Sequence, residues 1–175
     1  MASSQQLLMQ GKVEVDEMVV GRQEAGTKGR QNEDKKLVVV PLERKNKGIG
    51  RMYARVIKDG SSSSLRPFFH DHMDKNAEIK TDEWKGYRPL KATFPHLTQI
   101  ASGKKGEHFP EMHRAIMMFK AWLRGTHHAV EHLQAYLDEY CYRFNRHLMK
   151  GKLFDRLMDR MVAHSPVYCE NLTIY

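Results

Sequence analysis

Two aspartates stand in predicted apolar strands, each on the face opposite to the buried side chains. Asp16 lies in the alternating segment Lys12–Val20, and Asp82 closes the alternating segment Ala77–Asp82. If these strands are neighbours, the two carboxylates meet. Paired hard oxygen ligands suit Mg²⁺ or Mn²⁺, and two such ions about 4 Å apart activate a water and stabilise the leaving oxygen when a phosphodiester is cut. Spacing alone leaves open that both acids are solvated surface residues.

A second group of polar side chains follows one side of a predicted helix that starts near Phe109. His113 and Lys120 are seven residues apart, close to two turns, so they share a side, and Arg124 follows one turn later. A metal ligand followed by a cation that holds phosphate is what a nuclease-like site needs. A solvent-facing polar stripe on an amphipathic helix is the alternative that this spacing leaves open.

The strands that must position these residues are predicted from period-2 alternation and short apolar runs. They are Lys12–Val20, Leu37–Val40, Ile49–Ile57 and Ala77–Asp82, with a further short strand at Leu97–Ala101 inside the irregular segment Pro89–Gly106. Pro41 is expected to stop the second strand, and the first three strands follow each other closely enough for an antiparallel meander. A crossover helix between the third and fourth strands is long enough for parallel pairing.

Helical spacing of apolar residues predicts the remaining elements. The serine run Ser61–Ser64 is interpreted as a helix N-cap rather than a flexible linker, because apolar residues recur at helical spacing directly after it. Further helices are expected from Phe109 to Gly125, from about Glu131 to Leu148 and from Lys152 to His164. This order of elements predicts an α/β fold, a mixed sheet flanked by helices.

Composition limits the class of protein and of partner. The chain has 175 residues, enough for one domain, and 29 Lys plus Arg against 21 Asp plus Glu give a net charge of +8. A polyanionic partner is therefore indicated, with nucleic acid the commonest one. No run of about 18 apolar residues could cross a bilayer, which argues against a membrane protein. Two cysteines and the start MASSQQLLMQ favour a reduced cytoplasmic protein.

Four segments in order resemble the catalytic domain of insertion-sequence transposases of the DDE type. These segments are VEVDEMVVG (Val13–Gly21), KTDEWKGY (Lys80–Tyr87), HRAIMMFKAWLRGTHH (His113–His128) and HLQAYLDEYCYRFNR (His132–Arg146). The resemblance implies a ribonuclease H-like fold, cleavage and joining of DNA at insertion-sequence ends, and a divalent metal cofactor. It matches Asp16 and Asp82 to the first and second catalytic Asp, and Lys120 to the family's Lys.

The sequence departs from the family pattern at the third acidic position, which falls on His113 instead of the usual Glu. Neutral imidazole removes one negative charge from the metal shell and favours a softer ion than Mg²⁺. His113 is one candidate for the third ligand, Glu111 or Glu107 is another, and an inactive copy is the third interpretation. We favour His113, because Glu111 lies on a different helix face and Glu107 precedes the helix.

Several residues around these segments are candidate DNA contacts. The expected set comprises Lys120, Arg124, His127, His128, Arg143 and Arg146, with His127 and His128 able to touch phosphate or cap the helix. Trp84 and Trp122 could stack on unpaired bases, although isolated aromatic residues usually belong to a core.

The domain organisation expected from the sequence is one catalytic domain over residues 1–175, with a flexible lead at 1–11 and a helical extension at 149–175. The zinc-ribbon and helix-turn-helix region found in related families is expected to be absent, because no Cys-x-x-Cys pair occurs. DNA at the transposon ends and in the target is the expected partner. The active complex is expected to be a homodimer in the cytoplasm, associated with the nucleoid. A catalytically inactive, basic nucleic-acid-binding remnant is the alternative function.

Overall fold

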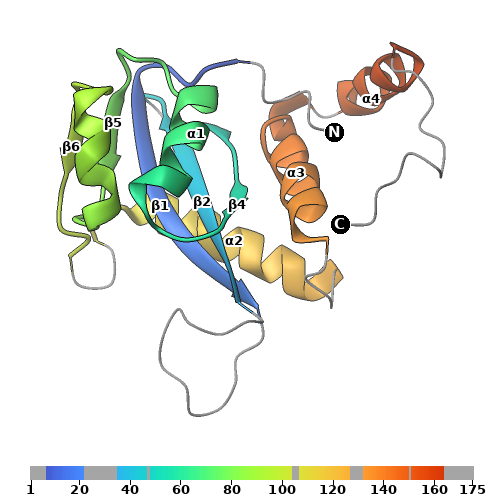
Figure 1. Cartoon of the computed structure of the whole chain (residues 1–175). Coiled ribbons are helices and arrows are strands. Elements are labelled where there is room, and N and C mark those ends of the chain that lie inside the picture. Colours follow the sequence, from blue (N-terminus) through green and yellow to red (C-terminus); the bar gives the residue numbers. More distant parts are fainter. Residues whose placement is uncertain are drawn as a thin grey trace.

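The computed structural model describes residues 7–21, 35–46, 48–103, 107–126, 132–149 and 151–163. Its strands form a six-stranded sheet in the order β3-β2-β1-β5-β6, with β4 also paired to β2 (Figure 1). The strands are β1 (Lys12–Gly21), β2 (Lys35–Arg44), β3 (Ile49–Met52), β4 (Arg55–Ile57), β5 (Glu78–Thr81) and β6 (Leu97–Gln99). The helices are α1 (Ser62–His72), η2 (Lys85–Ala92), α2 (Pro110–Thr126), α3 (Leu133–Phe144), η4 (His147–Met149) and α4 (Lys152–Ala163).

The sheet is mixed, as the sequence predicts. β1 pairs antiparallel with β2 along its whole length, and β3 and β4 pair antiparallel with β2. β5 is parallel to β1, and β6 is parallel to β5. The helix α1 between β4 and β5 is the crossover that this parallel pairing requires.

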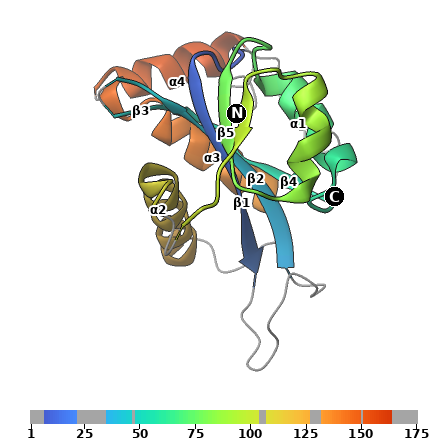
Figure 2. The same cartoon turned by 90° about the vertical axis from the view of Figure 1, so that its left-hand side faces the viewer.

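Helices cover both faces of the sheet, with α1 on one side and α2 on the other (Figure 2). One apolar core joins the sheet to α1 and η2, and the second joins it to α2 and α3. In β1 the buried side switches along the strand. Val13 and Val15 belong to the α1 core, whereas Met18 and Val20 belong to the α2 core. This three-layer arrangement with a mixed central sheet is the ribonuclease H-like fold.

The serine run caps α1, as predicted. Ser61 is the N-cap residue, and its hydroxyl accepts a hydrogen bond from the backbone N–H of Ser64. Asp59 accepts hydrogen bonds from the hydroxyls of Ser61 and Ser64. The apolar side of α1 is buried through Leu65 and Phe68 among others, so the segment is a helix start and not a linker.

Pro41 does not stop the second strand, contrary to the sequence prediction, because β2 continues to Arg44. The carbonyl of Pro41 accepts a hydrogen bond from the N–H of Tyr53 at 3.2 Å. In a strand the N–H and C=O of one residue point to the same side, so the missing donor of Pro41 also faces this side. Residues 53–54 separate β3 from β4 there, and the ladder is already interrupted.

The predicted single strand Ile49–Ile57 is divided into β3 and β4, and two amide side chains of α3 complete its outer edge. Asn145, which follows α3, accepts from the N–H of Met52 at 2.7 Å and donates to the C=O of Met52 at 2.9 Å. Gln134 accepts from the N–H of Val56 at 2.9 Å and donates to the C=O of Ala54 at 3.2 Å. We call Gln134 and Asn145 the edge cap, because they satisfy backbone groups that an edge strand leaves open.

Two further differences concern the helices. The start of the segment predicted to be irregular is part of the 3-10 helix η2, which buries Tyr87 and Leu90. The helix α4 forms close to its predicted limits but buries none of its described side chains. In the described part of the chain, no helix has the length and apolarity needed to span a membrane.

Candidate metal centre

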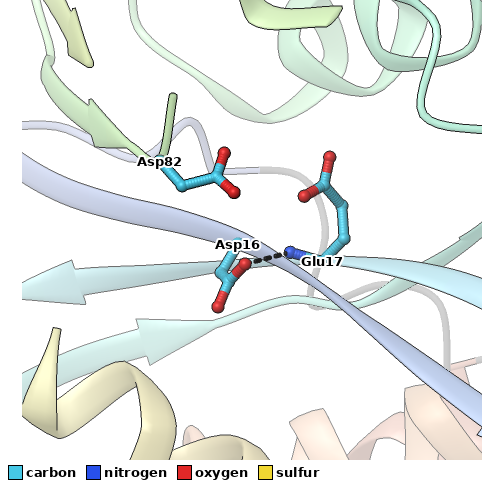
Figure 3. A group of neighbouring side chains, drawn as sticks. All are labelled: Asp16, Glu17 and Asp82. Carbon is cyan, nitrogen blue, oxygen red and sulfur yellow. Dashed lines mark hydrogen bonds between the residues drawn. The ribbon is translucent and has the colours of Figure 1, made fainter. Parts of the chain in front are cut away.

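The two aspartates meet in the middle of the sheet, at the carboxyl-terminal end of β5. The pairing of β5 with β1 stops at Thr81 opposite Val15, and β1 continues to Gly21. Asp82 therefore lies beside the next residues of β1. Ligand oxygens of Asp16, Glu17 and Asp82 all lie within 4.8 Å of one another (Figure 3). The condition stated from the sequence, that the first and fourth predicted strands are neighbours, is met, because β1 pairs with β5.

Asp16 faces the layer that contains α2. Its Oδ1 accepts a hydrogen bond from the N–H of Glu17 at 2.8 Å, and its Oδ2 lies 4.0 Å from Nε2 of His113. His113 therefore lies beside a carboxylate that would hold a cation. The side chain of Asp16 is 24% exposed and that of His113 is 43% exposed, which leaves this side of the site open to solvent.

The loop after β5 holds Asp82 in place. Asp82 Oδ1 accepts a hydrogen bond from the backbone N–H of Trp84 at 3.0 Å. Gln99 of β6 donates from one Nε2 to the carbonyl of Asp82 at 3.2 Å and to that of Trp84 at 2.9 Å. The loop is thus tied to the neighbouring strand at the residue that carries the carboxylate and again two residues later.

Glu17 belongs to the cluster and was not among the sequence-predicted site residues. Strand alternation assigns Glu17 to the face opposite Asp16, and Figure 3 shows the two side chains leaving β1 on opposite sides. They share a site only because β5 ends beside them. Beyond the end of β5 no strand separates the two faces of the sheet on this side of β1, so both side chains can approach Asp82. The one signal in the sequence is that Glu17 directly follows Asp16.

Tyr87 lies beneath the cluster and is fully buried. Burial raises the pKa of the Tyr87 hydroxyl well above its usual value, and the carboxylates of Glu17, Asp82 and Asp16 raise it further. Among the three carboxylates, the charge of Glu17 has the largest effect on this hydroxyl. The negative charges of all three acids therefore act on the Tyr87 hydroxyl. A site of this kind favours a bound cation.

The helix α2 brings its polar side to the same cluster. Lys80 of β5 donates to the carbonyl of His108 at 2.9 Å and lies over the ring of Phe109, which fixes the start of α2 against the sheet. Burial lowers the pKa of the Lys120 ammonium, the charge of Arg124 lowers it further, and Asp16 opposes both effects. His113 and Lys120 thus both face Asp16, on the shared side that their spacing predicts.

The other acids near α2 lie outside the cluster of the described residues. Glu111 is close enough to Glu14 to help raise the pKa of the Glu14 carboxyl, after burial, the main cause. Glu107 lies 3.6 Å from His108, and its side chain packs beside Gly103. Neither joins Asp16, Glu17 and Asp82 in the ligand group.

The structure separates the remaining predicted DNA contacts. Arg124 is exposed on α2, and its Nε donates to the carbonyl of Lys120. Arg143 forms an ion pair with Glu139 at 2.7 Å, and Arg146 stacks on the ring of Tyr142. Both belong to the α3 region, which lies along β3 and β4 and is separated from the carboxylates by β2. His127 and His128 lie outside the described residues.

The donor set fits Mg²⁺ or Mn²⁺. Three carboxylates within 4.8 Å offer hard oxygen ligands, and such ligands at short range repel one another unless a cation lies between them. His113 brings a ring nitrogen to 4.0 Å from Asp16 but is not one of the three residues whose ligand atoms all lie within 4.8 Å of one another.

Comparison with known proteins supplies the family. Residues 8–145 match the family described as the ISXO2-like transposase domain, a range that contains every residue of the cluster and all of α2. No curated protein and no solved structure matches the chain. The family match covers most of the chain and agrees with the ribonuclease H-like sheet and with the paired strands that carry Asp16 and Asp82. The chain belongs to the ISXO2-like transposase domain family, of the DDE type.

Proposed function

We propose that this chain cuts and joins DNA phosphodiester bonds at insertion-sequence ends by a divalent-metal mechanism. The observation that supports this most is the convergence of Asp16, Glu17 and Asp82 within 4.8 Å at the end of β5. Family membership supplies the reaction class, since the family consists of transposase domains. The net charge of +8 suits a DNA substrate.

The residues that would hold Mg²⁺ or Mn²⁺ are Asp16, Asp82 and Glu17, with His113 as a further ligand on the α2 side. When bound, such ions activate a water and stabilise the leaving oxygen. Because His113 replaces a carboxylate with a neutral imidazole, we expect activity to favour Mn²⁺ over Mg²⁺.

The chain's own groups position the DNA strand. The Lys120 ammonium is half-buried and lies near Asp16, so it can bind a phosphate oxygen at the carboxylate cluster. Arg124, one turn further along α2, extends this positive side toward solvent. In the proposed sequence, water first attacks the phosphorus at the transposon end and releases a 3′ hydroxyl. That hydroxyl then attacks a phosphorus of the target DNA and displaces the 3′ oxygen of the target strand, which leaves as a hydroxyl.

The assembly and the location of the protein stay predictions. We propose a homodimer as the active complex, since two transposon ends must be joined to one target. We propose that the complex works in the cytoplasm at the nucleoid, where its DNA substrate lies.

An inactive, basic DNA-binding remnant is the second candidate function. The observation that favours it is His113 at a position where the family usually carries a glutamate. In this case the protein would bind DNA through its positive charge in a salt-dependent manner and would not cut it.

Nicking of supercoiled plasmid DNA in Mn²⁺ distinguishes the two functions. The purified chain should convert supercoiled to open-circular DNA, and Asp16→Asn should abolish the conversion. Glu111→Gln is the matched control, because this acid of α2 lies outside the ligand cluster and its loss should leave nicking unchanged. Equal nicking by the unmodified chain and by Asp16→Asn would mean that the activity comes from a contaminant. If the purified chain binds DNA but does not nick it, the protein is the inactive DNA-binding remnant.

A further inference from the structure

Trp84 is an exposed aromatic residue directly beside the carboxylate cluster. Its side chain is 40% exposed, and its backbone N–H donates to Oδ1 of Asp82 at 3.0 Å. The other tryptophan, Trp122, is partly buried and packs against the rings of Phe119 and Tyr140 in the α2 core. The two tryptophans therefore occupy different environments, and only Trp122 matches the expectation that an isolated aromatic residue belongs to a core.

The indole of Trp84 is held in one orientation although it is exposed. Its Nε1 donates to the carbonyl of Gly60 at 2.7 Å. Gly60 follows β4 and Trp84 follows β5. Both strands run parallel to β1, so their carboxyl-terminal ends lie at the same end of the sheet. The ring thus connects the loop after β4 to the loop after β5, at the end of the sheet where the carboxylate cluster lies.

Two glycines allow this close approach. A Cβ atom at Gly60 would lie 2.8 Å from Nε1 of Trp84. A Cβ atom at Gly86 would lie 2.0 Å from the carbonyl oxygen of Gly60 and 3.0 Å from the indole. A side chain at either position would therefore displace the ring. Fixing an exposed ring in this way lowers the conformational entropy that it loses when a flat ligand stacks on it.

We propose that Trp84 is a stacking platform for an unpaired DNA base next to the phosphate that is cut. This inference rests on the proposed function, because it assumes that DNA reaches Asp82. An indole face offers a base an uncharged contact beside acids that repel the phosphate backbone. Lys58 and Lys85 are exposed in the same two loops, but Asp59 and Glu83 lie beside them, so binding at this position would come from stacking and not from a local positive charge.

The test uses Trp84 itself as the reporter. The chain has two tryptophans, so Trp122→Phe leaves Trp84 as the source of indole fluorescence. The probes are a blunt DNA duplex and a duplex of the same sequence with three unpaired bases at one end, one of them 2-aminopurine. Binding is measured in EDTA, so that no cleavage occurs. Stacking predicts that the unpaired-end duplex, and not the blunt duplex, quenches the fluorescence of Trp84, and that the 2-aminopurine of the unpaired end is quenched when the protein binds.

Affinity measurements on Trp84 variants complete the test. Trp84→Ala should weaken binding of the unpaired-end duplex by roughly 5- to 100-fold, and Trp84→Phe should keep part of this affinity because it keeps a ring. The dependence of affinity on salt should not change, because no charge is removed. Mn²⁺ affinity, measured by titration calorimetry, should also be unchanged if the fold of the site is intact.

Two outcomes overturn the proposal. In the first, Trp84→Ala binds both duplexes as tightly as the unmodified chain does. In the second, Trp84→Ala and Trp84→Phe lose affinity for both duplexes equally and also lose Mn²⁺ affinity, which identifies a purely structural role. Neither outcome depends on the nicking assay. A failure of Trp84 to stack is therefore distinguishable from a failure of the metal-dependent reaction, which Asp16→Asn tests.

Discussion

The edge cap predicts that two polar side chains of the α3 region contribute strongly to stability. Asn145 makes both of its hydrogen bonds to one residue, Met52, which is only 2% exposed. Asn145→Ala removes both bonds and leaves a buried N–H and a buried C=O without these partners. No neighbouring strand can replace them, because β3 lies at the edge of the sheet.

The size of the effect follows from the burial of the backbone groups. A hydrogen bond contributes about 1 kcal/mol net, and a buried polar group that loses its partner costs about 1–3 kcal/mol. We therefore expect Asn145→Ala to lower the free energy of unfolding by about 2–4 kcal/mol. Gln134→Ala should cost less, about 1–3 kcal/mol, because water can reach the freed N–H of the half-buried Val56, and only the longer bond, 3.2 Å to the carbonyl of Ala54, involves a buried residue.

Urea unfolding followed by circular dichroism measures these losses. Glu139→Ala is the control in α3, since the i,i+4 ion pair with Arg143 that it removes contributes about 0.5 kcal/mol. The reasoning is refuted if Asn145→Ala costs no more than Glu139→Ala.

Three further predictions concern acid stability, phosphate binding and the metal ligands. Burial lowers the pKa of His72 from 6.5 to about 4, so the folded state favours the neutral ring. The contribution of this ring to the free energy of unfolding is therefore fully present above about pH 6.5. It is lost as the pH falls toward 4, by up to about 3 kcal/mol. Urea titrations at pH 7 and pH 4.5 should show a smaller acid loss in His72→Leu, and an equal loss in both proteins would contradict this. Lys120→Met should reduce nicking roughly tenfold or more without weakening Mn²⁺ binding, because it removes a positive charge near Asp16; unchanged nicking would exclude the phosphate role. Glu17→Gln should weaken Mn²⁺ binding by roughly 10- to 100-fold in titration calorimetry, with Glu111→Gln unchanged; equal affinities would remove Glu17 from the ligand set.

The placement of Asp16 and Asp82 could be predicted only in part. Which strand becomes the neighbour of β5 could not be predicted, because strand order depends on contacts across the whole sheet. Period-2 alternation gives the face of each acid, and the length of the crossover allows parallel pairing, because both properties are encoded within short segments. The shared side of His113 and Lys120 on α2 could be predicted for the same reason, since helical spacing alone decides it.

Features that depend on distant parts of the chain, such as the end of a neighbouring strand or a contact between two loops, could not be predicted in this way. Glu17 reaches the cluster because β5 ends at Thr81, a fact about the partner strand that alternation in β1 does not contain. Pro41 continues β2 because its missing donor faces the gap between β3 and β4. The environment of Trp84 depends on contact with Gly60, which is distant in sequence.

The central claim is that the carboxylates at the end of β5 form a divalent metal site that cuts DNA. A crystal structure with Mn²⁺, using anomalous scattering to locate the ion, tests it most directly. The account predicts an ion bound by Asp16 and Asp82 at about 2.0–2.3 Å, with Glu17 or His113 completing the protein ligands. Absence of an anomalous peak between Asp16 and Asp82 at saturating Mn²⁺, or a peak held by other residues, would contradict the account.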